Sequence, residues 1–173
     1  WASCLTTAQL KKLWEPKSSV KNWKDLDPKF PDQEIKLFGA GTDSGTFDFF
    51  TKEINGEEGS SRTDYQPTED DNVTVQGVGG EKGGLGYFGL SYFEQNKTAL
   101  KAVSVDGGKG CVAPSQETVQ DGSYEPLSRP LYVYVKKASF ARPEVKAFLE
   151  YTLKNQETIA KEALFVPLTA EQA

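Results

Sequence analysis

The sequence predicts an α/β fold with a mixed, mainly parallel sheet flanked by helices. Short apolar segments alternate with segments of helical spacing along most of the chain, and this order of elements is typical of such sheets. A glycine turn at residues 41–46, Gly-Thr-Asp-Ser-Gly-Thr, also joins a predicted strand directly to a predicted helix. Strand, short connection and helix in succession form the basic unit of α/β proteins.

The composition describes one domain with enough apolar residues to fill a core. The chain has 173 residues, of which 37% are hydrophobic, including three Trp and ten Phe. Its net charge of -5 argues against nucleic acid and anionic membranes as partners, because both reward a basic face. No stretch approaches the roughly 20 apolar residues of a membrane span, so we expect no direct membrane insertion by this segment.

The chain contains no His and no Met. The lack of His excludes histidine-based triads, His general bases and most zinc sites. We therefore expect neither a catalytic residue nor a metal. Because the chain begins at Trp1 without Met, we expect a processed protein, a fragment or an engineered piece.

The first predicted element is a helix that carries Leu10, Leu13 and Trp14. Thr6 and Gln9 have the spacing of a capping box, and the apolar residues of this segment fall on one helical face. Pro16 ends the helix because proline cannot continue it. Residues 16–34 are rich in Lys, Asp and Pro and are interpreted as an exposed connection, held to the body by its aromatic side chains.

The glycine turn lies between the best-defined strand and helix of the first half. We predict a strand over 34–38 and a helix over about 46–55 that ends at Asn55-Gly56. Residues 56–68 are expected to form a loop. A helix over about 69–78 follows, although three valines in this segment also permit a strand.

The second half alternates short strands with short helices. In chain order, the pattern predicts a strand over 85–88, a brief helix that opens with residues 90–93, a strand over 100–105 and a short helix over 115–119. Residues 131–135, with two Tyr and two Val, form the strongest predicted strand. Helices from Pro143 and around Ile159 complete the chain. The aromatic residues of these segments are expected to fill the core.

The glycine turn has two interpretations. In the first, it is an ordinary helix start, where Asp43 or Ser44 caps the helix and Gly45 relieves crowding. In the second, it holds an oxyanion, because the first N–H groups of a helix have no partner and carry partial positive charge. Ser44 and Thr46 would add hydroxyl donors. The glycine patterns of serine hydrolases, P-loop proteins and dinucleotide-binding folds do not match this turn.

Arg62 is one of only three arginines and lies in a Ser-Ser-Arg-Thr-Asp segment. A guanidinium group matches a tetrahedral oxyanion with two parallel hydrogen bonds, and Asp64 is close enough in sequence to orient it. The alternative is a solvated loop arginine. The acidic run at 69–71 is interpreted as a solvated helix start, since a calcium loop needs a longer alternating pattern.

Several segments together resemble the phosphate-binding component of the bacterial ABC phosphate importer (PstS-like). The resemblance covers essentially the whole chain, and its strength comes from the order and spacing of motifs that are individually weak. The matching segments are 39–48 (Gly-Ala-Gly-Thr-Asp-Ser-Gly-Thr-Phe-Asp), 61–65 (Ser-Arg-Thr-Asp-Tyr), 69–73 (Glu-Asp-Asp-Asn-Val), 110–114 (Gly-Cys-Val-Ala-Pro), 126–132 (Pro-Leu-Ser-Arg-Pro-Leu-Tyr) and 165–168 (Phe-Val-Pro-Leu).

This resemblance implies one lobe of a type II periplasmic-binding-protein fold, in which two α/β lobes enclose the ligand. Residues 1–128 would form the second, ligand-binding lobe. Residues 129–173 would form a return strand and C-terminal helices that pack on the first lobe or finish this one. The resemblance also implies an absent N-terminal part, which supplies further donors and an aspartate that accepts a proton from phosphate. Sulfate has no such proton at neutral pH.

The resemblance also implies the site and the function. Ser44, Gly45 and Thr46 match the family's Ser-Gly-Thr phosphate-binding turn. Many members place an arginine four residues before that serine, where this chain has Ala40, so Arg62 is the implied substitute. The expected function is binding of inorganic phosphate, without chemistry or cofactor, as the receptor of an ABC importer. The membrane permease of that importer is the expected partner, and the expected location is periplasmic or anchored at the cell surface.

Two other functions remain open: a receptor for another oxyanion, such as sulfate or molybdate, and a surface adhesin or scavenging protein with the same fold. Phosphoryl transfer would need a metal or a base, and the sequence indicates neither. Cys4 and Cys111 are the only cysteines and are either separate core thiols or one disulfide. The exported location implied by the resemblance favours the disulfide.

Overall fold

Two three-stranded sheets form the framework of the protein in the computed structural model, which describes residues 1–172. The first sheet has the order β3-β2-β4, with β2 (Lys36–Ala40) between β3 (Gln66–Thr68) and β4 (Gly84–Gly86). Both neighbours run parallel to β2, and Phe38 of β2 lies opposite Gln66 and Gly86. Because the three strands are parallel, their carboxyl ends lie at the same edge of this sheet.

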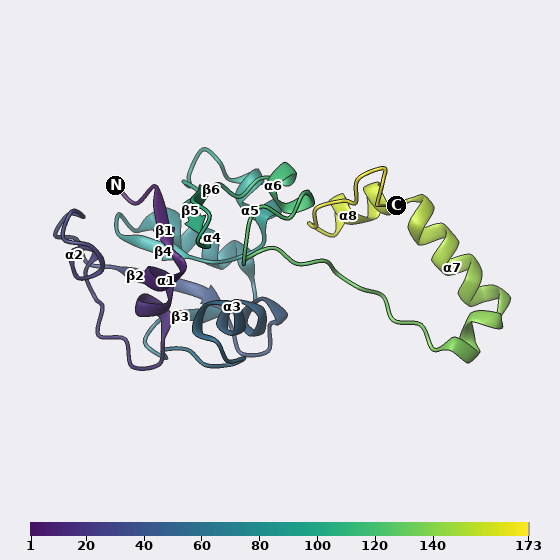
Figure 1. The fold of residues 1–173 in the computed structure, drawn as a ribbon, viewed down its shortest axis with the longest axis horizontal. Helices are drawn as coiled ribbons and strands as arrows, with labels where there is room; N and C mark the ends of the chain where they lie inside the picture. Colours follow the sequence, from purple (N-terminus) through teal and green to yellow (C-terminus); the bar gives the residue numbers. More distant parts are fainter. Residues whose placement is uncertain (173) are drawn as a thin grey trace.

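The second sheet has the order β1-β5-β6. Its strands are β1 (Cys4–Thr6), β5 (Ser104–Asp106) and β6 (Cys111–Val112). β1 pairs with β5 in parallel, while β5 and β6 are antiparallel. Parallel pairs therefore dominate, and helices lie beside the sheets (Figure 1). The predicted α/β class with a mixed, mainly parallel sheet is confirmed.

Within residues 1–128, three helices have eight residues or more. They are α1 (Thr7–Trp14), α3 (Gly45–Asn55) and α4 (Asp71–Gly80). The predicted capping box at the start of α1 is present, with the Thr6 and Gln9 side chains each bonded to the backbone of the other. Asp70 caps α4 by accepting from the Asn72 N–H, so this segment is a helix rather than a strand. Gly56 ends α3 with a φ of 91°, which glycine adopts without strain.

Shorter helices complete the body, which we define as residues 1–128. They are α2 (Trp23–Leu26), α5 (Leu90–Gln95) and α6 (Gln116–Gln120). α2 lies within the segment predicted to be an exposed connection. Trp23 is buried there and meets Phe30 edge to face, with ring centroids 5.7 Å apart. The Trp23 indole N–H donates to the Gly83 carbonyl at 3.2 Å, and Phe30 packs against the buried core. The expectation that aromatic side chains hold this connection to the body is confirmed.

An aromatic cluster around Trp14 joins the first sheet to α1 and α3. The Trp14 ring meets Phe50, Tyr65 and Tyr87 edge to face, and the Phe50 and Tyr87 rings stack with centroids 3.9 Å apart. Gly39 of β2 is required beneath this stack, because a Cβ atom there would lie 2.6 Å from the Tyr87 ring. The cluster fixes the position of α3 against the end of β2.

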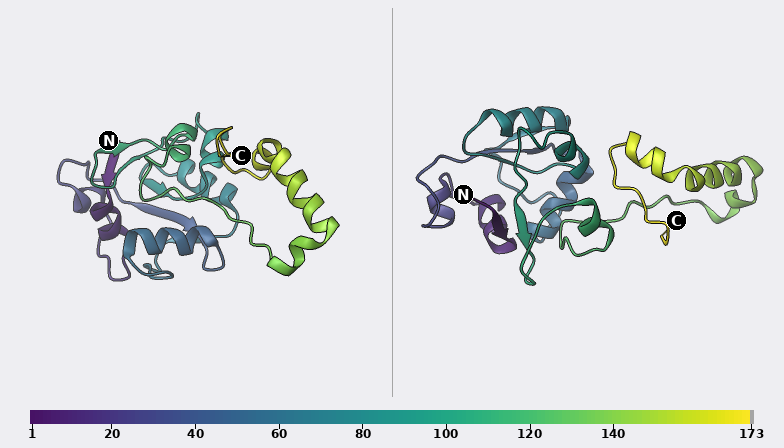
Figure 2. Two further views of the ribbon diagram at one scale, coloured as in Figure 1. Left: turned by 45° about the vertical axis from the view of Figure 1, so that its right-hand side comes forward. Right: turned by 90° about the horizontal axis from the view of Figure 1, so that it is seen from above.

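Residues 129–172, which we call the arm, extend away from the body in all three views (Figures 1 and 2). The arm contains a 3-10 helix, η1 (Lys137–Ala141), and the helices α7 (Pro143–Lys154) and α8 (Gln156–Glu162). Its far end returns to α6, where the Gln120 side chain donates to the Pro167 carbonyl at 2.8 Å. Within residues 1–172, none of the helices combines the length and apolar composition that crossing a bilayer requires.

The strand predicted over 131–135 is wrong. This segment pairs with no strand in the described part of the chain, and Tyr132 and Tyr134 are 69% and 89% exposed rather than buried. A high β propensity reflects a fit to a half-buried pleated surface, and no such surface lies beside these residues.

Candidate functional site

The carboxyl edge of the β3-β2-β4 sheet gathers the loops that carry the predicted site. Because the three strands are parallel, the chain leaves each of them at the same edge, which is where ligands bind in open α/β sheets. The Gly41 N–H donates to the Thr68 carbonyl at 3.0 Å. The Asp43 N–H lies 3.4 Å from the Glu69 carboxylate. The turn after β2 is thus joined to the loop after β3.

Ser44 is the N-cap residue of α3. Its Oγ accepts a hydrogen bond from the Thr46 N–H at 3.1 Å, and its backbone is extended. Ser44 rather than Asp43 therefore makes the side-chain cap. Gly45 is exposed, and both Ser44 and Thr46 are half-buried.

This geometry fits both interpretations of the turn. It is an ordinary cap, and it also leaves an exposed helix start with unpartnered amides and two nearby hydroxyl groups.

Negative side chains lie close to this helix start. Asp43 precedes it, Asp48 lies in the first turn of α3, and the Glu69 carboxylate packs against Gly41. Asp71 begins α4, and burial raises the pKa of its carboxyl group, partly offset by a hydrogen bond from the Gly89 backbone. An anion at the start of α3 would therefore need cationic help.

Arg62 is 4% exposed and makes internal hydrogen bonds. Its Nη1 donates to the Leu13 and Val20 carbonyls, both at 2.9 Å. Its Nε and Nη2 donate to the two carboxylate oxygens of Asp64, at 2.6 and 2.9 Å. These bonds join the end of α1 to the loop that carries Arg62.

Asp64 thus orients the Arg62 guanidinium, and this hydrogen bonding lowers the pKa of Asp64. Arg62 also lines a cavity of about 410 Å³ together with Gly41 and Thr42 of the glycine turn. Ser44, Gly45 and Thr46 do not belong to the lining of that cavity. A contact between Arg62 and an anion stays a prediction.

Arg129 lies at the start of α3, a position that the sequence did not reveal. Its Nη2 donates to the Gly45 carbonyl at 3.1 Å, and its Cζ lies 4.9 Å from the centre of the Phe49 ring. The only available signal was that Arg129 is one of three arginines and belongs to the 126–132 segment. Its distance from the turn along the chain concealed the contact.

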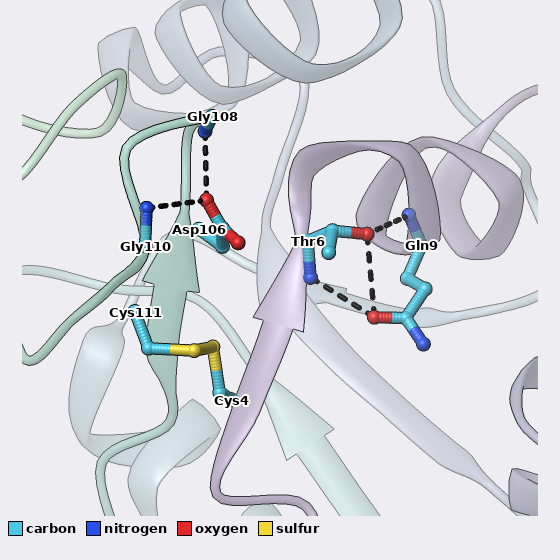
Figure 3. Close-up of a disulfide and its surroundings, with 7 residues drawn as sticks. All are labelled: Cys4, Thr6, Gln9, Asp106, Gly108, Gly110 and Cys111. Carbon is cyan, nitrogen blue, oxygen red and sulfur yellow. Dashed lines mark hydrogen bonds between the residues drawn. A yellow bond between two sulfur atoms is a disulfide. The ribbon is translucent and has the colours of Figure 1, made fainter.

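The predicted disulfide between Cys4 and Cys111 is present (Figure 3). It connects the two outer strands of the second sheet, β1 and β6, across β5. Beside it, the Asp106 carboxylate accepts from the Gly108 and Gly110 N–H groups at 2.8 and 3.0 Å, which closes the turn between β5 and β6. Among residues 1–172, no cluster of three or more His, Cys, Asp or Glu side chains is arranged to hold a metal ion.

Comparison with known sequences identifies relatives along nearly the whole chain. A family described as the PBP superfamily domain matches residues 2–156. Protein SphX of a Synechocystis species is 43% identical over 174 residues, which covers 99% of this chain and 52% of the relative. The phosphate-binding protein PstS of Staphylococcus haemolyticus is 39% identical over 164 residues, covering 94% of this chain and 50% of the relative. The chain spans about half the length of the curated relatives it matches.

Two solved structures superpose on nearly the whole chain. A possible phosphate binding protein from Planctomyces limnophilus superposes with a TM-score of 0.90 at 44% identity, covering 99% of this chain and 61% of that one. A Clostridium perfringens protein, assigned as the substrate-binding protein of a phosphate ABC transporter and crystallised with bound phosphate, gives a TM-score of 0.72 at 26% identity. That match covers 96% of this chain and 64% of the other.

Proposed function

The chain belongs to the PBP superfamily, and we propose that it binds inorganic phosphate as part of the receptor of an ABC phosphate importer. The observation that carries this proposal is the Ser44-Gly45-Thr46 helix start at the carboxyl edge of a parallel sheet. Relatives named as phosphate-binding proteins support phosphate as the ligand. The role is binding and release, without a chemical step.

The proposed site uses several weak donors together. The macrodipole of one exposed helix contributes only about 0.3–1 kcal/mol to an interaction with a charge. The Gly45 amide and the hydroxyl groups of Ser44 and Thr46 add directed hydrogen bonds, and Gly45 allows a close approach of the ligand to the backbone. Arg62 lines the neighbouring cavity together with Gly41 and Thr42, and the Nη2 N–H that Asp64 does not accept would be its donor to the ligand.

We further propose that residues 1–128 form one lobe of the receptor. Residues 129–173, which include the arm, would pack on the other lobe. The arm's exposed apolar side chains support this, because isolated short helices are marginal in water without a surface to cover them. The exposed apolar residues of the arm are Leu131, Tyr132, Val133, Tyr134, Phe140, Phe148, Tyr151, Leu153, Ile159, Phe165 and Leu168.

The proposed location is outside the cytoplasm, with the importer's permease as the partner. The Cys4–Cys111 disulfide supports it, since disulfides persist in oxidising compartments and are rare in the cytosol of most organisms. Capture of the permease by the full-length protein would test the partnership. An adhesin or scavenging protein would bind phosphate without the permease.

Calorimetric titration of the full-length protein with phosphate and with sulfate at pH 7.5 tests the ligand. We expect phosphate to bind with a Kd in the micromolar range or tighter and sulfate at least about 100-fold more weakly, because a site that accepts the phosphate proton leaves its acceptor unpartnered with sulfate. If the protein bound sulfate or molybdate more tightly than phosphate, the ligand would be that oxyanion and not phosphate. Absence of binding to all three would overturn the proposal.

A further inference from the structure

We propose that Arg129 supplies a guanidinium contact to the bound anion at the start of α3, an inference that rests on the proposed phosphate function. The role differs from that of Arg62, whose side chain is buried and bonded to Asp64 and to two carbonyl groups. Arg129 is exposed and lies against the first turn of α3.

The donors of the two arginines explain why Arg129 is the better candidate. Four of the five N–H groups of Arg62 point to Leu13, Val20 and Asp64. In residues 1–172, the single recorded hydrogen bond of Arg129 goes to the Gly45 carbonyl, and no carboxylate forms an ion pair with it. Since a guanidinium has five N–H donors, most of those of Arg129 remain available to a ligand.

Local charge makes such a cation necessary. Asp43, Asp48 and Glu69 lie on or beside the turn, and the whole chain has a net charge of -5. A phosphate dianion brought to this edge would meet repulsion that a helix dipole only partly offsets. Arg129 is the arginine that the described structure places at the first turn of α3.

Two features hold the Arg129 guanidinium in position. It lies over the face of the Phe49 ring, an attractive arrangement for a cation. Gly45 leaves room for it, since a Cβ atom at that position would lie 3.3 Å from Arg129 Nη2. The glycine therefore has a use beyond backbone approach, because it admits the guanidinium beside the helix start.

A cavity of about 500 Å³ brings the same segments together. Thr46 and Phe49 of α3 line it, as does Leu127, two residues before Arg129. The chain that leads into the arm therefore faces the same space as the first turn of α3. Because Arg129 begins the arm, an anion bound to both Arg129 and Thr46 would also hold the arm to the body. Ligand binding would then favour the arrangement in which the arm is held to the body. The size of this effect is set by the difference in ligand affinity between that arrangement and one in which the arm is released.

The substitution Arg129→Gln separates a ligand contact from a structural one. Glutamine retains an N–H donor for the Gly45 carbonyl but has no charge. In the full-length protein, we expect R129Q and R129A each to weaken phosphate binding by about tenfold or more in calorimetry, and R129K to lose less. The dependence of phosphate affinity on ionic strength should also become shallower in R129Q.

Arg142→Gln is the matched control, because Arg142 is exposed and pairs with Glu144 of the arm. It should leave phosphate affinity unchanged. Thermal unfolding without phosphate should show equal Tm values for R129Q and the wild type, with the phosphate-induced rise in Tm reduced in R129Q alone. Wild-type affinity and salt dependence in R129Q would overturn the role of Arg129 while leaving the proposed function intact. No phosphate binding by the wild type would overturn both.

Discussion

The Arg129 guanidinium donates a hydrogen bond to the Gly45 carbonyl at 3.1 Å, although the two residues are 84 positions apart in the sequence. This contact places the beginning of the arm against the first turn of α3. Gly45 is thereby both the first residue of the helix and the neighbour of a cation. Its lack of a side chain has consequences for stability and for binding that can be measured separately.

Gly45→Ala should therefore weaken phosphate binding without unfolding the protein. The added Cβ atom would meet Arg129 Nη2 at 3.3 Å and shift the guanidinium by a few tenths of an ångström, while alanine favours helix over glycine by up to about 1 kcal/mol. We expect a several-fold rise in Kd by calorimetry and an equal or higher Tm without ligand. Gly80→Ala is the control, since a Cβ atom there meets nothing within 4 Å. Equal affinities in both variants would contradict the steric role of Gly45.

Ser44→Ala should reduce both stability and affinity. It removes the cap bond to the Thr46 N–H, which costs about 0.5–2 kcal/mol in unfolding free energy, and it removes a proposed donor to the ligand. Ser115 caps α6 in the same way by accepting from the Thr118 N–H at 3.1 Å. Chemical denaturation and calorimetry on S44A and S115A should show destabilisation in both but weaker phosphate binding only in S44A. Equal binding by the two variants would mean that Ser44 is a cap alone.

Low pH should weaken the ion pair between Arg62 and Asp64 and thereby destabilise the fold. The hydrogen bond from Arg62 holds the pKa of Asp64 below its usual value, with a smaller contribution from Lys21. A carboxyl group with a lowered folded-state pKa stabilises the fold above its unfolded pKa of about 3.9, and this contribution disappears as the pH falls through the folded value. Urea denaturation between pH 6 and pH 2.5 should show less acid destabilisation in Asp64→Asn than in the wild type. Parallel curves would exclude this linkage.

Gly77→Ala should destabilise the body. A Cβ atom on Gly77 of α4 would lie 2.3 Å from the ring of Phe38, which is buried in β2. Overpacking of this kind typically costs about 1–3 kcal/mol. Gly80→Ala lies one turn further along the same helix and meets no neighbour, so it should unfold at or above the wild-type Tm. Similar Tm values for the two variants would contradict the packing of α4 on β2.

Local patterns predicted the elements around the site well. The capping box of α1, the helix α4 and the helix start after the glycine turn depend on residues within a few positions of one another. β1, β3 and β6 were missed because each has three residues or fewer and none lies within a longer apolar segment of the kind that indicated β4 and β5. β3 also contains Pro67, which argues against a strand in any sequence pattern.

Contacts between distant segments could not be predicted in the same way. The strand expected at 131–135 needs a neighbouring strand, and none in the described residues lies beside it. The carbonyl partners of Arg62, on Leu13 and Val20, lie more than 40 positions away. These contacts of Arg62 and the contact of Arg129 with Gly45 correspond to no periodic pattern in the sequence, because they depend on how the helices and strands pack together.

A crystal structure of the full-length protein grown with phosphate would show directly whether the start of α3 binds the anion. We expect an anion at the start of α3, with its oxygen atoms about 2.6–3.2 Å from the Ser44 and Thr46 hydroxyl groups and from the Gly45 amide. We also expect the Arg129 guanidinium within hydrogen-bond distance of the same anion. Phosphate bound elsewhere, with this helix start facing solvent, would rule out both the Ser44-Gly45-Thr46 site and the contact with Arg129.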